Sequence, residues 1–250
     1  MLRLETFLAG LPMLLDGTLV SLGLTLVTVI CGAAVALPVA LARNGRSTPA
    51  RWLANGFIFL FRGAPLLVLL YLVYYGLPQF QWLRASPAWF LLREPYVCAV
   101  LALSLNSAGY VAPIISGALR AVPRGEVEAA TAAGFGRLAV LRLVMLPHAA
   151  RIALRSYGNE IIFVIKGTSV ASLVTIGELM RQANAVYFNT YDPFTPFLTA
   201  GAIYLVLVFL VTRAIGLAER RLSPELRVGP RSVAQMTQKA AQPVAMRSAE

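Results

Sequence analysis

Three ionisable side chains, Arg62, Glu160 and Lys166, lie within long apolar stretches of the sequence. A charge in apolar surroundings is costly, so such residues mark a binding site, a pathway or an ion pair. Asn106 and Tyr110, in another apolar stretch, could add neutral hydrogen-bonding groups. A carboxylate with these neighbours could bind the amino group or the cationic side chain of a small solute.

Glu160 has two interpretations. It could face a pathway, helped by Asn106 and Tyr110, or it could pair with Lys166 or Arg62 and hold helices together. Lys166 lies late in its apolar stretch and could also extend to the membrane interface. Arg62 precedes Gly63 and Pro65, which favours a structural role, bonding carbonyls that a kink leaves free.

Helix geometry places further polar groups near these charges. On a helix through 154–173, Asn159 and Lys166 share one face, because residues seven apart differ by only about 20° around the axis. Glu160 lies about 100° away from Asn159. In the stretch that holds Asn106 and Tyr110, Gly109 and Pro113 predict a weakened, partly unwound helix where a solute could bind.

Several chemistries are excluded by the residues present. His148 is the only histidine, so an HExxH metal site and a histidine-based catalytic triad are both excluded, and we expect this side chain to be solvated. There is no GxxxxGK[ST] phosphate-binding loop, so the chain cannot hydrolyse ATP through such a loop. Cys31 and Cys98 lie in apolar runs and read as packing residues.

The composition indicates a membrane protein. Hydrophobic residues make up 58% of the 250 residues and charged ones only 13%, about half the charged share of a soluble domain. The net charge of +11 does not indicate nucleic-acid binding, because no otherwise soluble surface carries it. The fold class predicted is an all-α membrane protein, since backbone polar groups must be paired within lipid.

Five stretches are long and apolar enough to cross a bilayer, which takes about 20 residues. They cover residues 17–42, 57–77, 95–118, 154–173 and 196–217. We expect residues 1–16 to be a short external segment and 17–222 to be the membrane domain. Residues 223–250 lose the apolar pattern and are predicted to be a disordered tail on the cytoplasmic side of the membrane.

The distribution of basic residues predicts the orientation. Of the 22 Lys and Arg residues, 16 fall in the first loop, in the long loop after the third span and in the tail, against four on the other side. Positive charge is retained on the cytoplasmic side. We therefore predict a periplasmic N-terminus and a cytoplasmic C-terminus.

The loop at residues 120–151 is longer than a connection requires. Its first part favours a short helix that Gly134 or Gly136 would end, and a second helical pattern follows that Pro147 would stop or kink. Two short helices at the membrane surface indicate a docking element.

This loop resembles the signature of ABC-importer permease subunits: Glu-Ala-Ala, three residues, Gly, nine residues, Ile, one residue, Leu-Pro. The matching residues are Glu128, Ala129, Ala130, Gly134, Leu146 and Pro147, with Val144 in place of Ile. Three further motifs, at 62–65, at 105–110 and at 158–160 with 166–169, are similar to motifs of the polar amino acid uptake branch, the branch of histidine, glutamine and opine permeases. The resemblance covers about residues 15–222.

The resemblance implies a type I ABC-importer permease with a cytoplasmic coupling helix. Two such subunits, identical or related, would form the pathway in the bacterial inner membrane, two ATP-binding cassette ATPase subunits would drive it, and a periplasmic solute-binding protein would deliver the solute. ATP and magnesium would be used by the ATPase; this chain would be no enzyme and would need no cofactor or metal. Glu128 would contact the ATPase, and Ala129 and Ala130 would allow close approach.

The resemblance also bears on the solute. Asn159-Glu160 is more similar to permeases for basic amino acids and opines than to those for glutamine, where Asn-Gln is similar. Many relatives carry an acidic residue before Ile114, where this chain has Pro113, so the partner permease supplies that carboxylate or the solute is not strongly cationic. The alternatives to a basic amino acid importer are an importer of an opine or other small polar amine and a secondary transporter, although the latter would not need the loop at 120–151.

Overall fold

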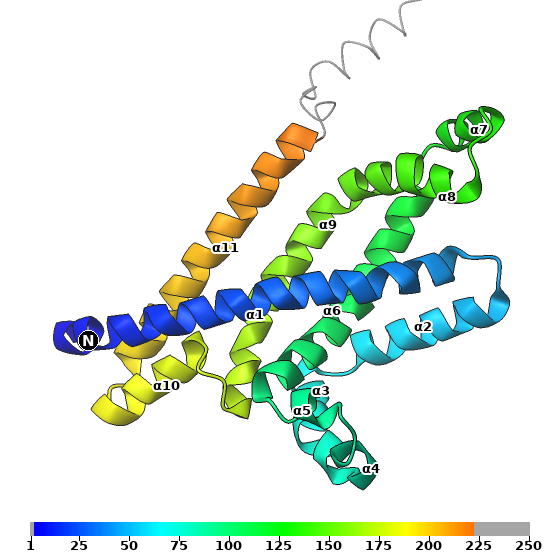
Figure 1. Ribbon diagram of the computed structural model, residues 1–250. Coiled ribbons are helices and arrows are strands. Elements are labelled where there is room, and N and C mark those ends of the chain that lie inside the picture. The colour runs from blue at the N-terminus through cyan, green and yellow to red at the C-terminus, as the bar shows by residue number, and fades with distance from the viewer. Residues whose placement is uncertain (1–2, 223–250) are drawn as a thin grey trace, which may run out of the picture.

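The computed structural model describes residues 3–222, and the regular elements among them are all helical (Figure 1). The predicted disorder of 223–250 lies outside the described residues. The helices are α1 (Leu4–Asn44), α2 (Thr48–Gly63), α3 (Leu66–Tyr71), α4 (Gln81–Arg84), α5 (Trp89–Leu92), α6 (Pro95–Arg120), α7 (Arg124–Ala132), α8 (Arg137–Ala139), α9 (Leu146–Gly167), α10 (Leu179–Thr190) and α11 (Phe194–Leu222). Short π-helical segments lie at η1 (Leu72–Gly76) and η3 (Val140–Met145), and 3-10 segments at η2 (Leu77–Gln79) and η4 (Thr168–Val174).

Three described helices, α1, α6 and α11, are unbroken and long enough to cross a bilayer. Two more candidate spans are helix pairs, α2 with α3–η2, bent by 102°, and α8–η4 with α10, bent by 50°. The predicted five spans are reached when each bent pair counts as one. The regular structure of residues 3–222 is therefore all-helical as predicted, but the second and fourth spans are broken.

The first helix begins earlier than the sequence predicted. It starts at Leu4 rather than near residue 17, so most of the predicted N-terminal segment is helical. Packing explains the extension, because Thr6, Gly10 and Leu14 are buried and a Cβ on Gly10 would lie 3.1 Å from Val186 of α10. Glu5 in the first turn also favours the start of a helix.

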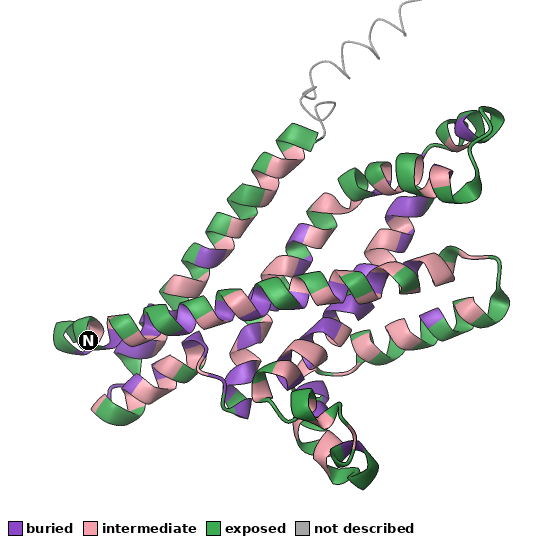
Figure 2. Ribbon diagram, viewed as in Figure 1, coloured by how far each residue is buried: buried purple, intermediate pink, exposed green. Residues whose placement is uncertain are grey.

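The long helices pack through small residues and turn large apolar side chains outward. The buried stripe of α1 includes Gly17, Ser21 and Gly32, whereas Leu19 is 68% exposed. This arrangement suits a lipid environment, where close helix contact depends on small side chains. The central helix is α6, which packs against α1, α2, α3 and α9 and is the most thoroughly buried, while α11 remains largely exposed (Figure 2).

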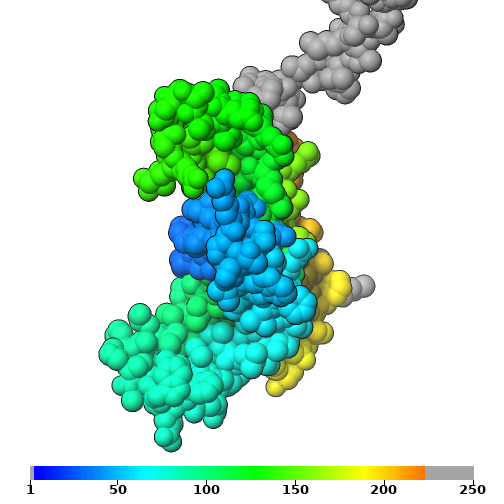
Figure 3. Space-filling model, turned by 90° about the vertical axis from the view of Figure 1, so that its right-hand side faces the viewer, coloured from blue at the N-terminus to red at the C-terminus, as the bar shows by residue number. Residues whose placement is uncertain are grey.

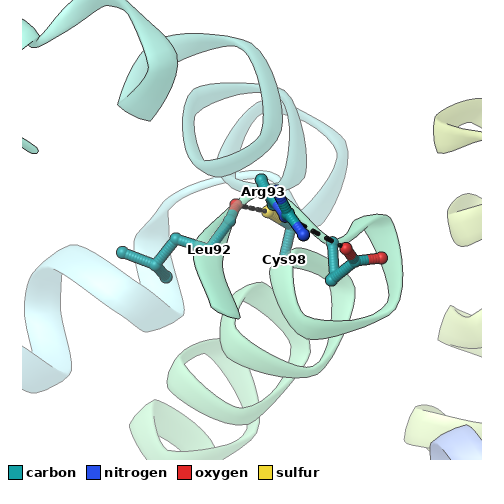
Figure 4. Close-up of polar contacts among 4 residues, drawn as sticks. Leu92, Arg93 and Cys98 are labelled. Carbon is teal, nitrogen blue, oxygen red and sulfur yellow. Dashed lines mark hydrogen bonds and ion pairs between the residues drawn. The ribbon is translucent and has the colours of Figure 1, made fainter. Parts of the chain in front are cut away.

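The structure has two opposite ends. The segment α7–α8 lies at one end and α3–α5 at the other, with the α1–α2 hairpin between them (Figure 3). At the turn into α6, Cys98 is buried and its thiol donates to the Leu92 carbonyl at 3.1 Å, while Arg93 pairs with Glu94 at 3.4 Å (Figure 4). Cys98 is thus a packing residue, as predicted.

Two helix interruptions predicted from proline differ in the structure. Residues Gly109 and Pro113 do not unwind α6, which is helical from Pro95 to Arg120. Pro147 does not stop the helix either; it sits at the start of α9, directly after the π-helical segment η3. A proline at the first turn of a helix loses no hydrogen bond, and the wider turns before it let the chain continue.

Candidate functional site

The break between α2 and α3 is held by α6. The Asn106 amide donates to the Phe61 carbonyl at 2.9 Å, and the Tyr110 hydroxyl donates to the Arg62 carbonyl at 3.2 Å. These are carbonyls at the end of α2, which Pro65 prevents from continuing. The sequence predicted that the Arg62 side chain would hydrogen-bond the carbonyls freed by the kink. In the structure, Asn106 and Tyr110 form these hydrogen bonds.

Gly109 lets α6 approach this break. A Cβ at Gly109 would lie 2.9 Å from the Arg62 nitrogen and 3.1 Å from the Phe61 carbonyl carbon. Only a residue without a side chain fits here, because the neighbouring atoms are backbone. The role of Gly109 is therefore close packing rather than weakening of the helix.

Two adjoining pockets lie between α6 and α9 beside this break. One of about 260 Å³ is lined by Leu66, Leu103, Asn106, Tyr110, Glu160, Phe163, Val164 and Gly167. The other, of about 340 Å³, is lined by Arg62, Tyr110, Pro113, Ile114, Ser156, Asn159, Glu160 and Phe163. Tyr110, Glu160 and Phe163 line both. The structure thus brings together all four residues predicted for a pathway, Asn106, Tyr110, Asn159 and Glu160.

Glu160 is the buried charge of these pockets. It is 7% exposed, and the Ser107 side chain hydrogen-bonds its carboxyl group. Within residues 3–222, neither Arg62 nor Lys166 forms an ion pair with it. The Lys166 ammonium lies 5.9 Å from the ring centroid of Phe163 and outside both pocket linings. The interhelical ion pair, one of the two interpretations of Glu160, is not formed.

The loop with the Glu-Ala-Ala residues forms a short capped helix. Helix α7 ends at Ala132, and Gly134, two residues further on, has a positive φ of 85°. The Gly134 amide donates to the Thr131 carbonyl and the Phe135 amide to the Ala130 carbonyl, both close to 3.0 Å. These two hydrogen bonds together form a Schellman cap, which requires a residue with left-handed backbone angles at the position of Gly134. Glu128 and Ala129 remain exposed, and Ala130 is buried.

A hollow of about 570 Å³ adjoins this helix, between the ends of α1 and α6. Its apolar lining residues include Leu119 and Met145, and its charged lining residues are Arg120, Arg124 and Glu128. Glu128 thus faces a hollow of the size that ligands and partner side chains occupy.

The base of the loop is fastened by the only histidine. The Nδ1 of His148, at the start of α9, lies 3.2 Å from a carboxylate oxygen of Glu126 in α7. Leu146 packs beside them against an apolar cluster formed by Ala118, Leu119, Val122 and Ala149. His148 is therefore not simply solvated as expected. Its partner is distant in sequence, and no short-range spacing indicated the contact.

Glu178, a buried carboxylate that sequence analysis missed, joins three helices at the start of α10. Glu178 is fully buried; it accepts from the Arg181 amide at 2.7 Å, the Tyr204 hydroxyl at 3.1 Å and Ser21 at 3.4 Å. It caps α10 and connects it to α1 and α11. The residue follows Gly177 in an apparent loop, so its burial could not be inferred from an apolar pattern.

Asp192, in the connection between α10 and α11, was also missed. It accepts from the Thr195 hydroxyl at 2.6 Å and from the backbone amides of Phe194 and Thr195. The Thr195 hydroxyl hydrogen bond, followed by these amides, lowers the pKa of Asp192 below its usual value. The residue acts as a cap for α11.

A bundle of apolar helices with a polar pocket between its spans and a capped helix outside them is the architecture of a multi-pass membrane protein. Residues 30–224 match the family model described as binding-protein-dependent transport system inner membrane component. The chain belongs to this family.

The known proteins it resembles are permeases. It is 39% identical to the nopaline transport system permease of Agrobacterium fabrum (strain C58 / ATCC 33970), over 90% of this chain and 93% of that protein. It is 41% identical to the arginine ABC transporter permease of Escherichia coli (strain K12), over 84% and 95% respectively. A crystal structure of an amino acid ABC transporter with histidines shares the fold, with a TM-score of 0.76, 31% identity, and coverage of 88% of this chain and 99% of that one. These matches confirm the type I importer permease architecture.

Proposed function

We propose that this chain is the permease subunit of an ATP-driven importer for polar, basic amino acids. The observation that carries the proposal is Glu160, a buried carboxylate that lines two adjoining pockets and has no cationic partner among residues 3–222. A buried charge is retained where something compensates it. A passing ammonium or guanidinium group would do so here.

The neighbours of Glu160 suit a small polar solute. Asn106, Tyr110 and Asn159 add neutral donors and acceptors, and Phe163 offers an exposed ring. A cation can lie against such a ring. The second pocket, at about 340 Å³, is within the range of roughly 300 to 1,000 Å³ that ligand sites occupy. The similarity to an arginine permease and to a nopaline permease agrees with this solute class.

The pockets open on a face that a second permease subunit would cover. Tyr110 on α6, and Asn159 and Phe163 on α9, are exposed on candidate membrane spans. Polar groups at this depth do not face lipid. A second copy of this chain, or a related chain, would close the pathway, and alternating access would follow from the two subunits rocking against each other.

Helix α7 would couple this movement to an ATP-binding cassette ATPase. Ala129 is exposed and small enough for close approach, and the exposed Glu128 lines the adjoining hollow, where it would meet a partner side chain. The contact of Glu126 with His148 joins α7 to α9, which carries Glu160. Movement of α7 would thus reach the pocket through one continuous helix. ATP and magnesium would be bound by the ATPase, and this chain would need no cofactor or metal.

The remaining partners follow from the family and the charge pattern. A periplasmic solute-binding protein would deliver the amino acid at the α3–α5 end, and no nucleic acid is involved. The distribution of basic residues supports an orientation with α7 and the C-terminus in the bacterial cytoplasm and the N-terminus in the periplasm. Membrane lipid would surround the exposed apolar side chains, such as Leu19 and Leu205.

Uptake by the complete transporter tests the solute. Cells expressing it would be given labelled arginine, lysine, histidine, glutamine, glutamate and an opine. We expect arginine, lysine and histidine to be taken up in preference to glutamate. Preference for the opine would support the opine alternative, and uptake that persists without the ATPase would indicate a secondary transporter.

Co-purification tests the coupling role of α7. Glu128→Lys reverses the charge at the hollow, and we expect it to abolish co-purification with the ATPase while the protein stays folded in the membrane. Glu94→Lys, an exposed carboxylate before α6, is the matched control and should retain the ATPase. Retention by both variants would refute docking through Glu128.

A further inference from the structure

Arg62 lies in the last turn of α2 and lines the same pocket as Glu160. Its backbone is fixed in place, because the Tyr110 hydroxyl binds the Arg62 carbonyl and the Asn106 amide binds the preceding carbonyl. The close contact of Gly109 with the Arg62 nitrogen fixes it further. The base of this side chain is therefore set by three contacts with α6.

Among the described residues, the Arg62 guanidinium lies against an aromatic ring and no acceptor takes a hydrogen bond from it. Its central carbon lies 5.3 Å from the centroid of the Tyr110 ring. A cation above an aromatic face is oriented by the ring, while its N–H groups stay free to donate in its own plane. Within residues 3–222, Arg62 forms no ion pair. The Arg62 guanidinium is therefore oriented and unneutralised.

Two opposite charges thus line one pocket without pairing to each other. Glu160 is buried on the α9 side, Arg62 is exposed at the end of α2, and the neutral Ser156 and Asn159 complete the polar lining. A solute that carries both a carboxylate and a cationic group would satisfy both. An arginine side chain suits this task, because its planar fork can bind a carboxylate through two parallel hydrogen bonds.

We propose that Arg62 binds the carboxylate of the transported solute while Glu160 faces its cationic group. This inference rests on the proposed function and narrows it to α-amino acids and amino-acid derivatives that keep a free carboxylate. Simple amines and decarboxylated amino acids would be poor solutes. Arg62 would be a residue that determines specificity inside the membrane, apart from any selection by a binding protein.

Binding to the permease–ATPase complex in lipid nanodiscs, without binding protein, tests this assignment. Labelled L-arginine is the ligand, and agmatine, which is arginine without its carboxylate, is the competitor. We expect wild type to prefer arginine by about 10-fold or more, as one charge-assisted contact allows. In Arg62→Gln this preference should vanish with agmatine affinity unchanged, and Arg62→Lys should restore part of it.

Arg213→Gln is the matched control, because Arg213 also lies over an aromatic ring, 5.0 Å from the Phe209 centroid, but lines neither pocket. It should keep the preference for arginine. A preference that survives in Arg62→Gln, or equal loss of both solutes, would overturn the role of Arg62 and leave the proposed function standing. No saturable arginine binding by wild type would refute the pathway site and this assignment together.

Discussion

Gly109→Ala should disturb the joint between α6 and the end of α2. The added Cβ would lie 2.9 Å from the Arg62 nitrogen and 3.1 Å from the Phe61 carbonyl carbon. Ordinary contact distances begin near about 3.5 Å, so the end of α2 must move by roughly half an ångström. Backbone atoms cannot rotate away as a side chain could. The Tyr110 hydrogen bond to the Arg62 carbonyl, already 3.2 Å long, would then exceed bonding distance.

The expected cost combines overpacking and the lost hydrogen bond. Overpacking costs about 1 to 3 kcal/mol, and a hydrogen bond contributes about 1 kcal/mol. Alanine's better helix propensity offsets about 0.5 to 1 kcal/mol. We expect a net loss of about 2 kcal/mol, which lowers Tm by about 4 to 8 °C for a chain of this length. Displacement of Arg62 should also weaken arginine binding.

Thermal unfolding of the purified protein in detergent measures this cost, and Gly117→Ala is its control. Gly117 lies in the same helix, and a Cβ there would meet nothing within 4 Å. The control should therefore be neutral or slightly stabilising. Equal Tm values for the two variants would refute the close approach at Gly109 as a determinant of the site.

Three further substitutions test separate contacts. Gly158→Ala places a Cβ 2.6 Å from the Cδ1 of Ile215 and should destabilise the α9–α11 contact by about 1 kcal/mol; Ile215→Ala should relieve this, and strictly additive Tm changes in the double variant would contradict the contact. Gly134→Ala should lower the free energy of unfolding by about 1 to 2 kcal/mol, because residue 134 has a φ of 85°, and it should speed amide hydrogen exchange in α7. Gly136→Ala, at a φ of −65°, should do neither. Equal exchange rates in the two variants would refute the cap at Gly134. Asp192 has a lowered pKa, so the stabilisation that its carboxylate provides is present at neutral pH and is lost as pH falls below about 4 through the native pKa. The difference in Tm between wild type and Asp192→Asn should shrink over that range. A difference in Tm that stays constant with pH would contradict a stabilising role for the Asp192 carboxylate.

The sequence predicted elements where one residue property decides the outcome. Apolar runs marked the membrane helices, and the need for a left-handed residue after a helical pattern narrowed the cap to Gly134 or Gly136, of which the structure has Gly134. The pathway residues converged because Asn106 and Tyr110 lie one turn apart on one helix and Asn159 and Glu160 are adjacent on another. Local geometry was enough for the cap and for each pair of residues on its own helix, whereas the packing of α6 against α9 that brings the two pairs together is tertiary.

Features that depend on tertiary packing were not predictable from local pattern. The start of α1 at Leu4 depends on its contact with α10. Three contacts join separate segments of the sequence. They are the hydrogen bonds from α6 to the α2 carbonyls, the Glu126–His148 contact and the hydrogen bonds of the buried Glu178. Gly109 was interpreted as a helix-weakening residue, but its role is set by its close contact with the end of α2.

The most direct test of the account is the solute dependence of uptake in Glu160→Gln. Cells expressing the whole transporter would be given labelled arginine, lysine, glutamine and glutamate, with wild type and Glu5→Gln, an exposed carboxylate of α1 outside the pockets, as controls. The account predicts that uptake of arginine and lysine falls in Glu160→Gln while that of glutamine is retained. Equal loss for every solute, or no loss, would contradict a role for Glu160 in the pathway.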